Sequence, residues 1–314
     1  MDNLTHSLVG ALLGQVGLKK KTGLAMPALI IGANLPDIDG TCLIYGTQSL
    51  AMRRGLTHGP LAWVILPLVL AGILWGFDRW QAKRGTRPET RAPVSFRWLY
   101  ALALVACLTH PALDWLNSYG IRLLAPFSQR WFYGDTLFIA DVWLWAILSF
   151  ATWWSLRREK RGGKWRLPAR IGLAVALAYV AANLGISRLT AGEARRDEPY
   201  PQVVIANPVI LAPWRREILF PQGDSWWARG WSLSGGLGKP RHLWLSMPCA
   251  LPGGAARKDN ADLAAFLFWS RAPFAEMDPS SGGILVEDAR FAGRTPSGLF
   301  AVALPELACR PPGE

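Results

Sequence analysis

Charged residues are scarce in this chain: of its 314 residues only 18% are Asp, Glu, Lys or Arg, whereas 51% are apolar. An intrinsically disordered chain is therefore excluded, because such chains lack apolar and aromatic residues. Cysteine is also scarce, and four cysteines in a chain of this length exclude a small disulfide-stapled scaffold. Proline and glycine, by contrast, are plentiful at 23 and 31 residues, and they exclude a long coiled coil. A folded protein of about two domains remains.

The net charge of +12 is concentrated in the first part of the chain. Residues 1–186 carry 20 basic and 9 acidic residues, whereas residues 187–314 carry 14 and 13. A nucleic-acid-binding protein would show a basic stripe on a soluble domain, but here the excess charge lies in loops between apolar runs. The charge therefore argues against a nucleic-acid partner and favours a membrane protein.

Six apolar runs divide the first 186 residues. They are Leu4–Leu18, Leu24–Tyr45, Leu61–Phe77, Trp98–His110, Leu137–Leu156 and Ile171–Ile186. A helix that spans a bilayer needs about 20 mostly apolar residues, and three of the runs reach that length or come close to it. We expect an α-helical polytopic membrane domain over residues 1–186, with about six membrane or membrane-embedded helices. We also expect the first run to be retained, because no signal-peptide pattern surrounds it.

Basic residues collect in alternate loops between these runs. Loops 19–21, 78–97 and 157–170 hold 16 of them, whereas loops 46–60 and 111–136 hold four. By the positive-inside rule the three basic loops face the cytoplasm. The N-terminus and everything after residue 186 then lie on the outer side of the membrane.

The remaining residues, 187–314, are predicted to form a small, mostly β, extracytoplasmic soluble domain. Clusters of Pro and Gly separate short stretches with β character, among them residues 202–211, 242–247, 282–291 and 298–304. Cys249 and Cys309 both lie in this domain, and an oxidising compartment would permit a disulfide between them. Two unpaired cysteines are the alternative.

Histidine is scarce, with four residues in the chain, and three of these fall in the membrane part. Ionisable residues in or beside membrane helices are costly and are functional candidates by default. In the topology above, the three histidines and several aspartates all fall at the outer ends of the helices. They are His6, Asp37, Asp39, His58, His110, Asp114, Asp135 and Asp141. Because the topology rests on Lys and Arg alone, this convergence is an independent indication of a site.

The spacing of these residues favours a metal site. His110 and Asp114 are four residues apart and would share one face of a helix. Pro36 can end the second run, so that Asp37 and Asp39 project from a turn. Mixed His and Asp ligands suit Zn²⁺, Mn²⁺ or Fe, so the sequence predicts a divalent metal, with zinc as the leading candidate. A hydrogen-bonded polar cluster that only ties helices together is the alternative.

Four segments resemble the YdjM-like family of inner-membrane metal-dependent hydrolases, and they occur in that family's order. The segments are Asn3-Leu-Thr-His6, Gly32-Ala-Asn-Leu-Pro-Asp-Ile-Asp39, Arg54-Gly-Leu-Thr-His58-Gly59 and Leu108-Thr-His110-Pro-Ala-Leu-Asp114. The resemblance implies a multi-pass protein of the bacterial inner membrane, whose C-terminal domain would be periplasmic in the topology above.

That family is similar in turn to the zinc-dependent phospholipase C and P1 nuclease helical fold, whose members cleave phosphoesters with a cluster of zinc ions. Carried over by motif order, the resemblance implies a ligand set of His6, Asp37 or Asp39, His58, His110 and Asp114. The zinc phospholipases have further His and Glu ligands after the last of these motifs, and here Asp135 or Asp141 could substitute. Their N-terminal amine ligand would need a contribution from Met1 or Asp2. The resemblance therefore supports one or two ions rather than three.

The predicted function is hydrolysis of a phosphoester or related bond in a lipid or lipid-linked substrate at the outer face of the inner membrane. A bound ion would activate water and stabilise the developing negative charge, with Asp37 and Asp39 divided between ligand and general base. Arg53 and Arg54 either hold an anionic head group or are ordinary interfacial charges. Residues that could orient the ligands through hydrogen bonds are Thr5, Thr57, Thr109, Asn34 and Asn117. Helix N-cap positions are the alternative for the three threonines.

Two other classes of protein are alternatives. In one, the metal is structural and the β-rich tail binds an envelope partner. In the other, the polar cluster is the path of a transporter, but transporters place such residues near the bilayer midplane and often show internal repeats. Here the polar residues fall at one end of the helices and no repeat is evident, which disfavours transport.

Overall fold

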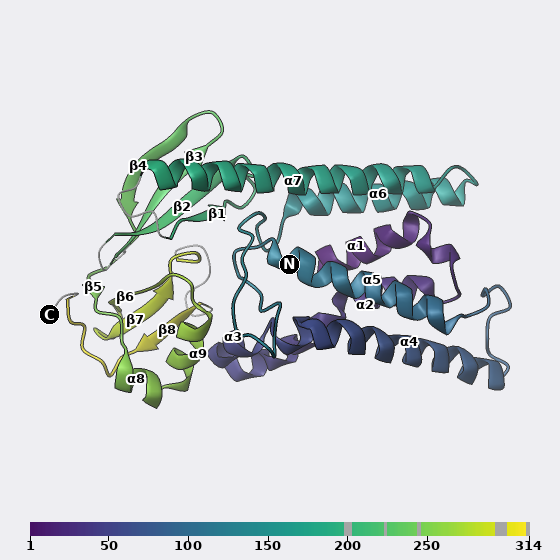
Figure 1. The fold of residues 1–314 in the computed structure, drawn as a ribbon, viewed down its shortest axis with the longest axis horizontal. Helices are drawn as coiled ribbons and strands as arrows, with labels where there is room; N and C mark the ends of the chain where they lie inside the picture. Colours follow the sequence, from purple (N-terminus) through teal and green to yellow (C-terminus); the bar gives the residue numbers. More distant parts are fainter. Residues whose placement is uncertain (198–202, 223–224, 244–245, 293–299, 312–314) are drawn as a thin grey trace. The chain divides into compact units, whose positions relative to one another are not determined.

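The computed structural model describes residues 1–197, 203–222, 225–243, 246–292 and 300–311 (Figure 1). The chain forms two compact units. Unit 1 comprises Met1–Asp39 and Arg54–Leu184, and unit 2 comprises Gly40–Arg53 and Gly185–Glu314. The chain therefore passes between the units three times, and two of these crossings bound residues 40–53.

Unit 1 is a bundle of helices. Its main helices are α1 (Asn3–Gln15), α2 (Ala25–Asn34), α4 (Pro60–Lys83), α5 (Phe96–Trp115), α6 (Val142–Lys160) and the first part of α7 (Arg166–Asp197). Each of the six corresponds to one of the predicted apolar runs. Among the described residues, α4, α5 and α7 are long and apolar enough to span a membrane.

The two N-terminal helices are too short to cross a bilayer. α1 and α2 have 13 and 10 residues, and at 1.5 Å per residue they measure about 20 and 15 Å, against a hydrocarbon core of about 30 Å. The second predicted run is divided because α2 ends at Asn34, just before Pro36. The helical fold class is therefore confirmed, but a count of six spans is not.

Small residues let the helices of unit 1 approach closely. At Gly10 of α1, a Cβ atom would lie 2.6 Å from the carbonyl oxygen of Leu29 on α2. At Gly32 of α2, a Cβ atom would lie 3.1 Å from the carbonyl oxygen of Ala103 on α5. α2 thus packs closely against both α1 and α5, and this packing holds together the helices that carry His6 and the His110–Asp114 pair.

The three basic loops meet at one end of unit 1. Lys19 forms an ion pair with Glu159 and lies 4.4 Å from the ring centroid of Trp165. Lys21 lies 4.8 Å from the ring centroid of Trp98. These contacts join the loop between α1 and α2 to the segments where α5 and α7 begin. The predicted ligands lie at the other end of these helices, and the side of a membrane that each end faces stays a prediction.

Unit 2 holds two four-stranded antiparallel sheets. The strands of the first sheet are β1 (Ile205–Pro208), β2 (Arg215–Gln222), β3 (Ser225–Ser232) and β4 (Gly236–His242). Those of the second are β5 (Pro248–Cys249), β6 (Pro273–Met277), β7 (Ile284–Asp288) and β8 (Ala301–Leu304). The helices α8 (Gly254–Asp259) and α9 (Ala261–Trp269) follow β5. The predicted β-rich tail is confirmed, although residues 202, 244–245 and 298–299 of the predicted stretches lie outside the described residues.

Alternating side chains of β2 are buried on both faces of the first sheet. Ile218 and Phe220 of β2 pack with Ala191 near the end of α7, whereas Leu219 between them packs with Phe274 of β6. Successive side chains of a strand point to opposite faces, so the first sheet lies between the end of α7 and the second sheet.

Residues 40–53 join unit 2 through α3 (Ser49–Met52), which packs against α9. The 3₁₀-helical η2 (Leu35–Gln48) precedes α3 and η3 (Leu56–His58) follows it, while a further short turn, η1 (Leu18–Lys20), lies between α1 and α2. The segment is therefore largely helical, and it links two stretches of unit 1.

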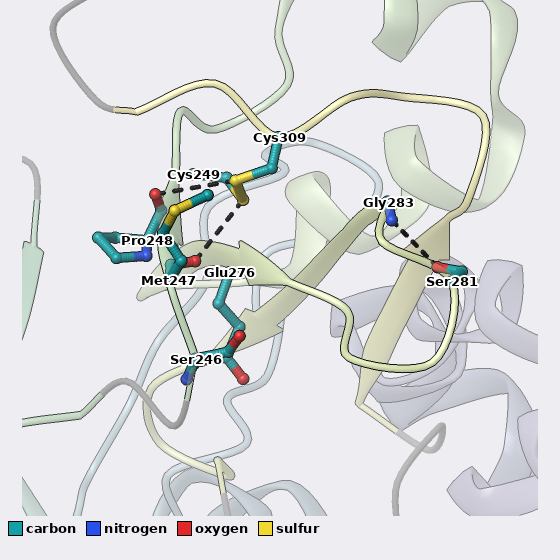
Figure 2. Close-up of a disulfide and its surroundings, with 8 residues drawn as sticks. All are labelled: Ser246, Met247, Pro248, Cys249, Glu276, Ser281, Gly283 and Cys309. Carbon is teal, nitrogen blue, oxygen red and sulfur yellow. Dashed lines mark hydrogen bonds between the residues drawn. A yellow bond between two sulfur atoms is a disulfide. The ribbon is translucent and has the colours of Figure 1, made fainter.

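A disulfide joins Cys249 to Cys309, with their Cα atoms 5.2 Å apart (Figure 2). Of the two alternatives for these cysteines, the disulfide is the one that the structure holds. It ties β5 to the segment after β8, where the Ala250 N–H also donates to the carbonyl oxygen of Arg310 at 2.7 Å.

Candidate metal centre

Four side chains from three segments converge at the end of unit 1 away from the basic loops. Asp37 lies in the first turn of η2, and His58 ends η3 directly before α4. His110 and Asp114 lie four residues apart near the end of α5. One ligand atom from each of the four residues lies within 4.8 Å of all the others. We call these residues the group of four.

The separations between these atoms fit a divalent ion. Nε2 of His58 lies 3.4 Å from Oδ2 of Asp114, and Nε2 of His110 lies 3.6 Å from both Oδ2 of Asp114 and Oδ1 of Asp37. Ligands at about 2.0–2.2 Å from a tetrahedrally coordinated zinc ion lie about 3.4 Å from one another. Direct hydrogen bonds would measure about 2.7–3.2 Å, so the spacing is that of atoms around a common centre.

Hydrogen bonding leaves the Nε2 atoms of both histidines for a metal. Nδ1 of His110 lies 2.7 Å from the carbonyl oxygen of Ala33, which can only accept, so Nδ1 carries a proton. A neutral ring that donates through Nδ1 presents a lone pair at Nε2. The Nε2 atoms of His58 and His110 are buried and have no hydrogen-bond partner among the described residues. Such buried polar atoms require an explanation, and metal coordination supplies one.

Thr57 and Asp39 contact His58 at Nδ1, the ring nitrogen that does not face the group of four. Oγ1 of Thr57 donates to Oδ2 of Asp39 at 2.8 Å and lies 2.9 Å from Nδ1 of His58, while Oδ2 of Asp39 is 3.3 Å from the same nitrogen. Burial lowers the pKa of His58 to about 4, so the ring is neutral at pH 7 and can offer Nε2 to an ion. Asp39 is thus an outer partner of His58, and Thr57 has the orienting role predicted for it.

His6 lies beside the group of four. Its ring stacks on that of His110 with centroids 3.7 Å apart, and its Nε2 is 3.4 Å from Oδ1 of Asp114. The amine of Met1 contacts the same Oδ1 atom. Both ring nitrogens of His6 are buried without a hydrogen-bond partner in the part of the chain that the structure describes, so His6 can serve as a further ligand.

Asp141 and Asp135 lie outside the group of four. Asp141 is the N-cap of α6: its carboxylate accepts from the N–H of Leu144 at 2.9 Å and from the hydroxyl of Tyr179 at 3.0 Å. A carboxylate at this position stabilises the start of a helix. These contacts give Asp141 a capping role and do not bring it into the group.

Comparison with known proteins covers the part of the chain that carries this centre. A model of the YdjM inner membrane protein family matches residues 1–189. The chain belongs to this family. A similar protein of Bacillus subtilis (strain 168), named Uncharacterized protein YfhP, is 28% identical to this YdjM-family chain over 141 residues. The match covers 42% of this chain, which spans only 39% of that relative's length. No solved structure matches the chain.

Arg54 is a residue of the site whose role in this YdjM-family protein the sequence did not reveal. Its side chain is buried, and Nε lies 3.0 Å from Oδ2 of Asp114. Nη1 donates to Oδ1 of Asn117 at 3.0 Å, so Asn117 fixes the guanidinium of Arg54, and its predicted role toward the ligands stays a prediction. The φ of Arg54, 53°, is uncommon for a residue with a side chain. The interpretation of Arg54 as ordinary interfacial charge is therefore wrong, because its guanidinium balances a buried carboxylate. Its one signal in the sequence is a position four residues before His58 in a loop with few basic residues.

The other predicted orienting residues bond elsewhere. Oγ1 of Thr5 donates to Asp2 at 2.6 Å, and Oγ1 of Thr109 donates to the carbonyl oxygen of Ala106 at 2.6 Å. Asn34 donates to a serine hydroxyl of α1 at 3.0 Å. These bonds stabilise the helices and their packing.

Proposed function

We propose that this YdjM-family protein is a membrane-embedded, metal-dependent hydrolase that cleaves a phosphoester or related bond in a lipid or lipid-linked substrate. The observation that carries the proposal is the group of four: two histidines with Nδ1 engaged by the protein face two carboxylates at metal-ligand spacing. Such donor sets suit Zn²⁺ and similar ions. One or two bound ions would supply a Lewis acid that activates water near neutral pH and stabilises negative charge on the reacting oxygen.

The residues around the ion would have separate roles in proton transfer, charge balance and orientation of the ligands. Asp37 is the one member of the group of four that is partly exposed, so it is suited to accept a proton from an attacking water. Arg54 neutralises Asp114, and Asp39 with Thr57 fixes the ring of His58. His6 completes the centre as a ligand or as a stacking partner of His110.

The outer face of the bacterial inner membrane is the proposed location, with a multi-pass chain and a periplasmic C-terminal domain. Two observations support it: the group of four lies opposite the basic loops, and the disulfide of unit 2 suits an oxidising compartment. A C-terminal alkaline phosphatase fusion tests the orientation. An active fusion is expected, and an inactive fusion would reverse the topology.

A structural metal site is the second candidate function, in which the β-rich tail would bind an envelope partner. His58, His110 and Asp114 are fully buried, and structural zinc sites are closed in this way. This closure is the observation that favours the second candidate.

Metal content and activity of the purified full-length protein separate the two functions. Bound metal is measured by mass spectrometry, and hydrolysis is measured on bis(p-nitrophenyl) phosphate and on phospholipid vesicles. Hydrolysis by the wild type and its loss in a folded His110→Ala variant would support the hydrolase. Bound metal without hydrolysis, together with unfolding of the variant, would support the structural site.

A further inference from the structure

Residues 40–53 of unit 2 expose a dense run of large apolar side chains. Leu43, Ile44, Tyr45 and Met52 are 55%, 82%, 55% and 43% exposed. Residues 40–52 also hold no charged residue. Single exposed apolar residues are ordinary on a protein surface, but a cluster of them marks an interaction surface.

Both ends of this segment adjoin the metal centre. Asp39 precedes it and Arg54 follows it, and the N–H of Arg54 donates to Oδ2 of Asp39 at 2.8 Å. This bond closes the segment into a loop whose base is formed by the outer partner of His58 and the counter-ion of Asp114. At that base, Ile38 and Leu56 are also exposed. The apolar surface therefore begins at the residues that flank the site.

The chemistry of the segment fits a lipid surface. The segment is too short to span a bilayer, which takes about 20 mostly apolar residues, so its apolar side chains could reach only the interfacial region. Tyr45 has the amphipathic ring that collects at membrane–water interfaces. Because η2 is 3₁₀-helical except for a break at Tyr45 and Gly46, part of its backbone hydrogen bonding is internal, which lowers the cost of contact with lipid. A candidate span, α4, begins shortly afterwards at Pro60.

We propose that residues 40–48, which precede the α3 helix packed on α9, insert into the headgroup and upper acyl region of the bilayer, and that lipid substrate enters the metal centre from this leaflet. The entry of substrate rests on the proposed hydrolase function, whereas the insertion does not. The alternative is that a protein covers this surface in place of lipid, and the following experiment would reveal it.

Insertion is tested by fluorescence quenching in the full-length protein with Cys42→Ser, while the buried Cys107 is left in place. Ile44→Cys is labelled with an environment-sensitive fluorophore, and the protein is reconstituted in nanodiscs whose acyl chains carry bromine. Leu233→Cys is the matched control, since Leu233 is 70% exposed in the turn between β3 and β4. We expect quenching several-fold stronger at position 44 than at position 233. Equal quenching at the two positions overturns the insertion. A label at position 44 that reports an apolar environment, but whose fluorescence is the same with and without brominated acyl chains, also overturns it.

Substrate entry is tested with the combined variant Leu43→Ser, Ile44→Ser, Tyr45→Ser. We expect its rate on vesicle phospholipid to fall by about tenfold or more, while its metal content and its rate on bis(p-nitrophenyl) phosphate stay at the wild-type level. Equal losses on the two substrates would overturn the proposed entry route. If the wild type hydrolyses neither substrate, the hydrolase proposal fails, and the quenching result alone decides the insertion.

Discussion

A histidine ring binds a metal well through one nitrogen when a hydrogen bond to the other fixes its tautomer. His110 meets this condition through the carbonyl oxygen of Ala33, and His58 meets it through Thr57 and Asp39. The members of the group of four were predictable from the sequence because ionisable residues stand out among apolar runs. The outer position of Asp39 and the burial of Arg54 were not, because both depend on contacts between distant segments.

Asp141 provides a test at the residue scale of which carboxylates bind the metal. Asp141→Ala should lower the free energy of unfolding by about 1 kcal/mol through loss of the α6 cap and leave the metal content unchanged. The matched comparison is Asp114→Ala, which should lose the metal. Thermal unfolding and metal analysis check both variants, and loss of metal from Asp141→Ala would instead make Asp141 a ligand.

Arg54 should matter most when no metal is bound. Arg54→Gln leaves the buried Asp114 without its guanidinium, and breaking a buried ion pair costs about 3–5 kcal/mol. A bound cation would replace that positive charge, so added metal should raise the unfolding temperature of Arg54→Gln more than that of the wild type. Arg53→Gln is the control. A metal-induced shift no larger than the wild-type shift would contradict the role given to Arg54.

At the scale of elements, helix length and helix packing decide the form of unit 1. The positions of the helices followed from the apolar runs, but their capacity to span a membrane did not. Pro36 divides the second run, and α1 and α2 are short helices packed against their longer neighbours. The close contacts that hold them depend on glycines whose partners lie on other helices, so no pattern within one run reveals them.

Gly10 should tolerate no side chain at the crossing of α1 and α2. Gly10→Ala places a Cβ 2.6 Å from the carbonyl oxygen of Leu29, and overpacking of this kind costs about 1–3 kcal/mol. Gly72→Ala in α4 is the matched control, because no atom lies within 4 Å of its added Cβ, and it should stabilise by about 0.5–1 kcal/mol. Thermal unfolding in detergent measures both, and equal stabilisation by the two changes would refute the close crossing.

Glu287 on β7 should make unit 2 less stable as the pH rises. Burial, and then the neighbouring carboxylate of Glu276, raise the pKa of Glu287 from 4.5 to about 6. The folded state therefore holds a proton that the unfolded state has lost, so this stabilisation is present below pH 4.5 and disappears as the pH rises through about 6. After allowance for solvent screening, the change is about 1 kcal/mol.

Hydrogen exchange of β6 and β7 in the full-length protein between pH 4.5 and 7, corrected for intrinsic rates, measures this effect. Glu287→Gln should abolish the pH dependence, whereas the exposed Glu306→Gln should preserve it. An unchanged pH dependence in Glu287→Gln would assign it to another group.

At the scale of the whole molecule, the division into two units does not follow a single cut in the chain. The β-rich character of the tail was predictable from its short strands and turn residues. The membership of residues 40–53 in unit 2 was not, because it rests on the packing of α3 against α9. The family match ends at residue 189, so it includes the metal centre and the apolar loop but none of the strands.

The central claim, that Asp37, His58, His110 and Asp114 hold a divalent ion, is tested most directly by metal analysis of the purified full-length protein. The protein is incubated with Zn²⁺, Mn²⁺ or Fe²⁺, freed of unbound ions and analysed by mass spectrometry beside the variant His58→Ala, His110→Ala. We predict one or two ions per wild-type chain and almost none in the variant. A wild-type chain that retains none of the three metals would contradict the account.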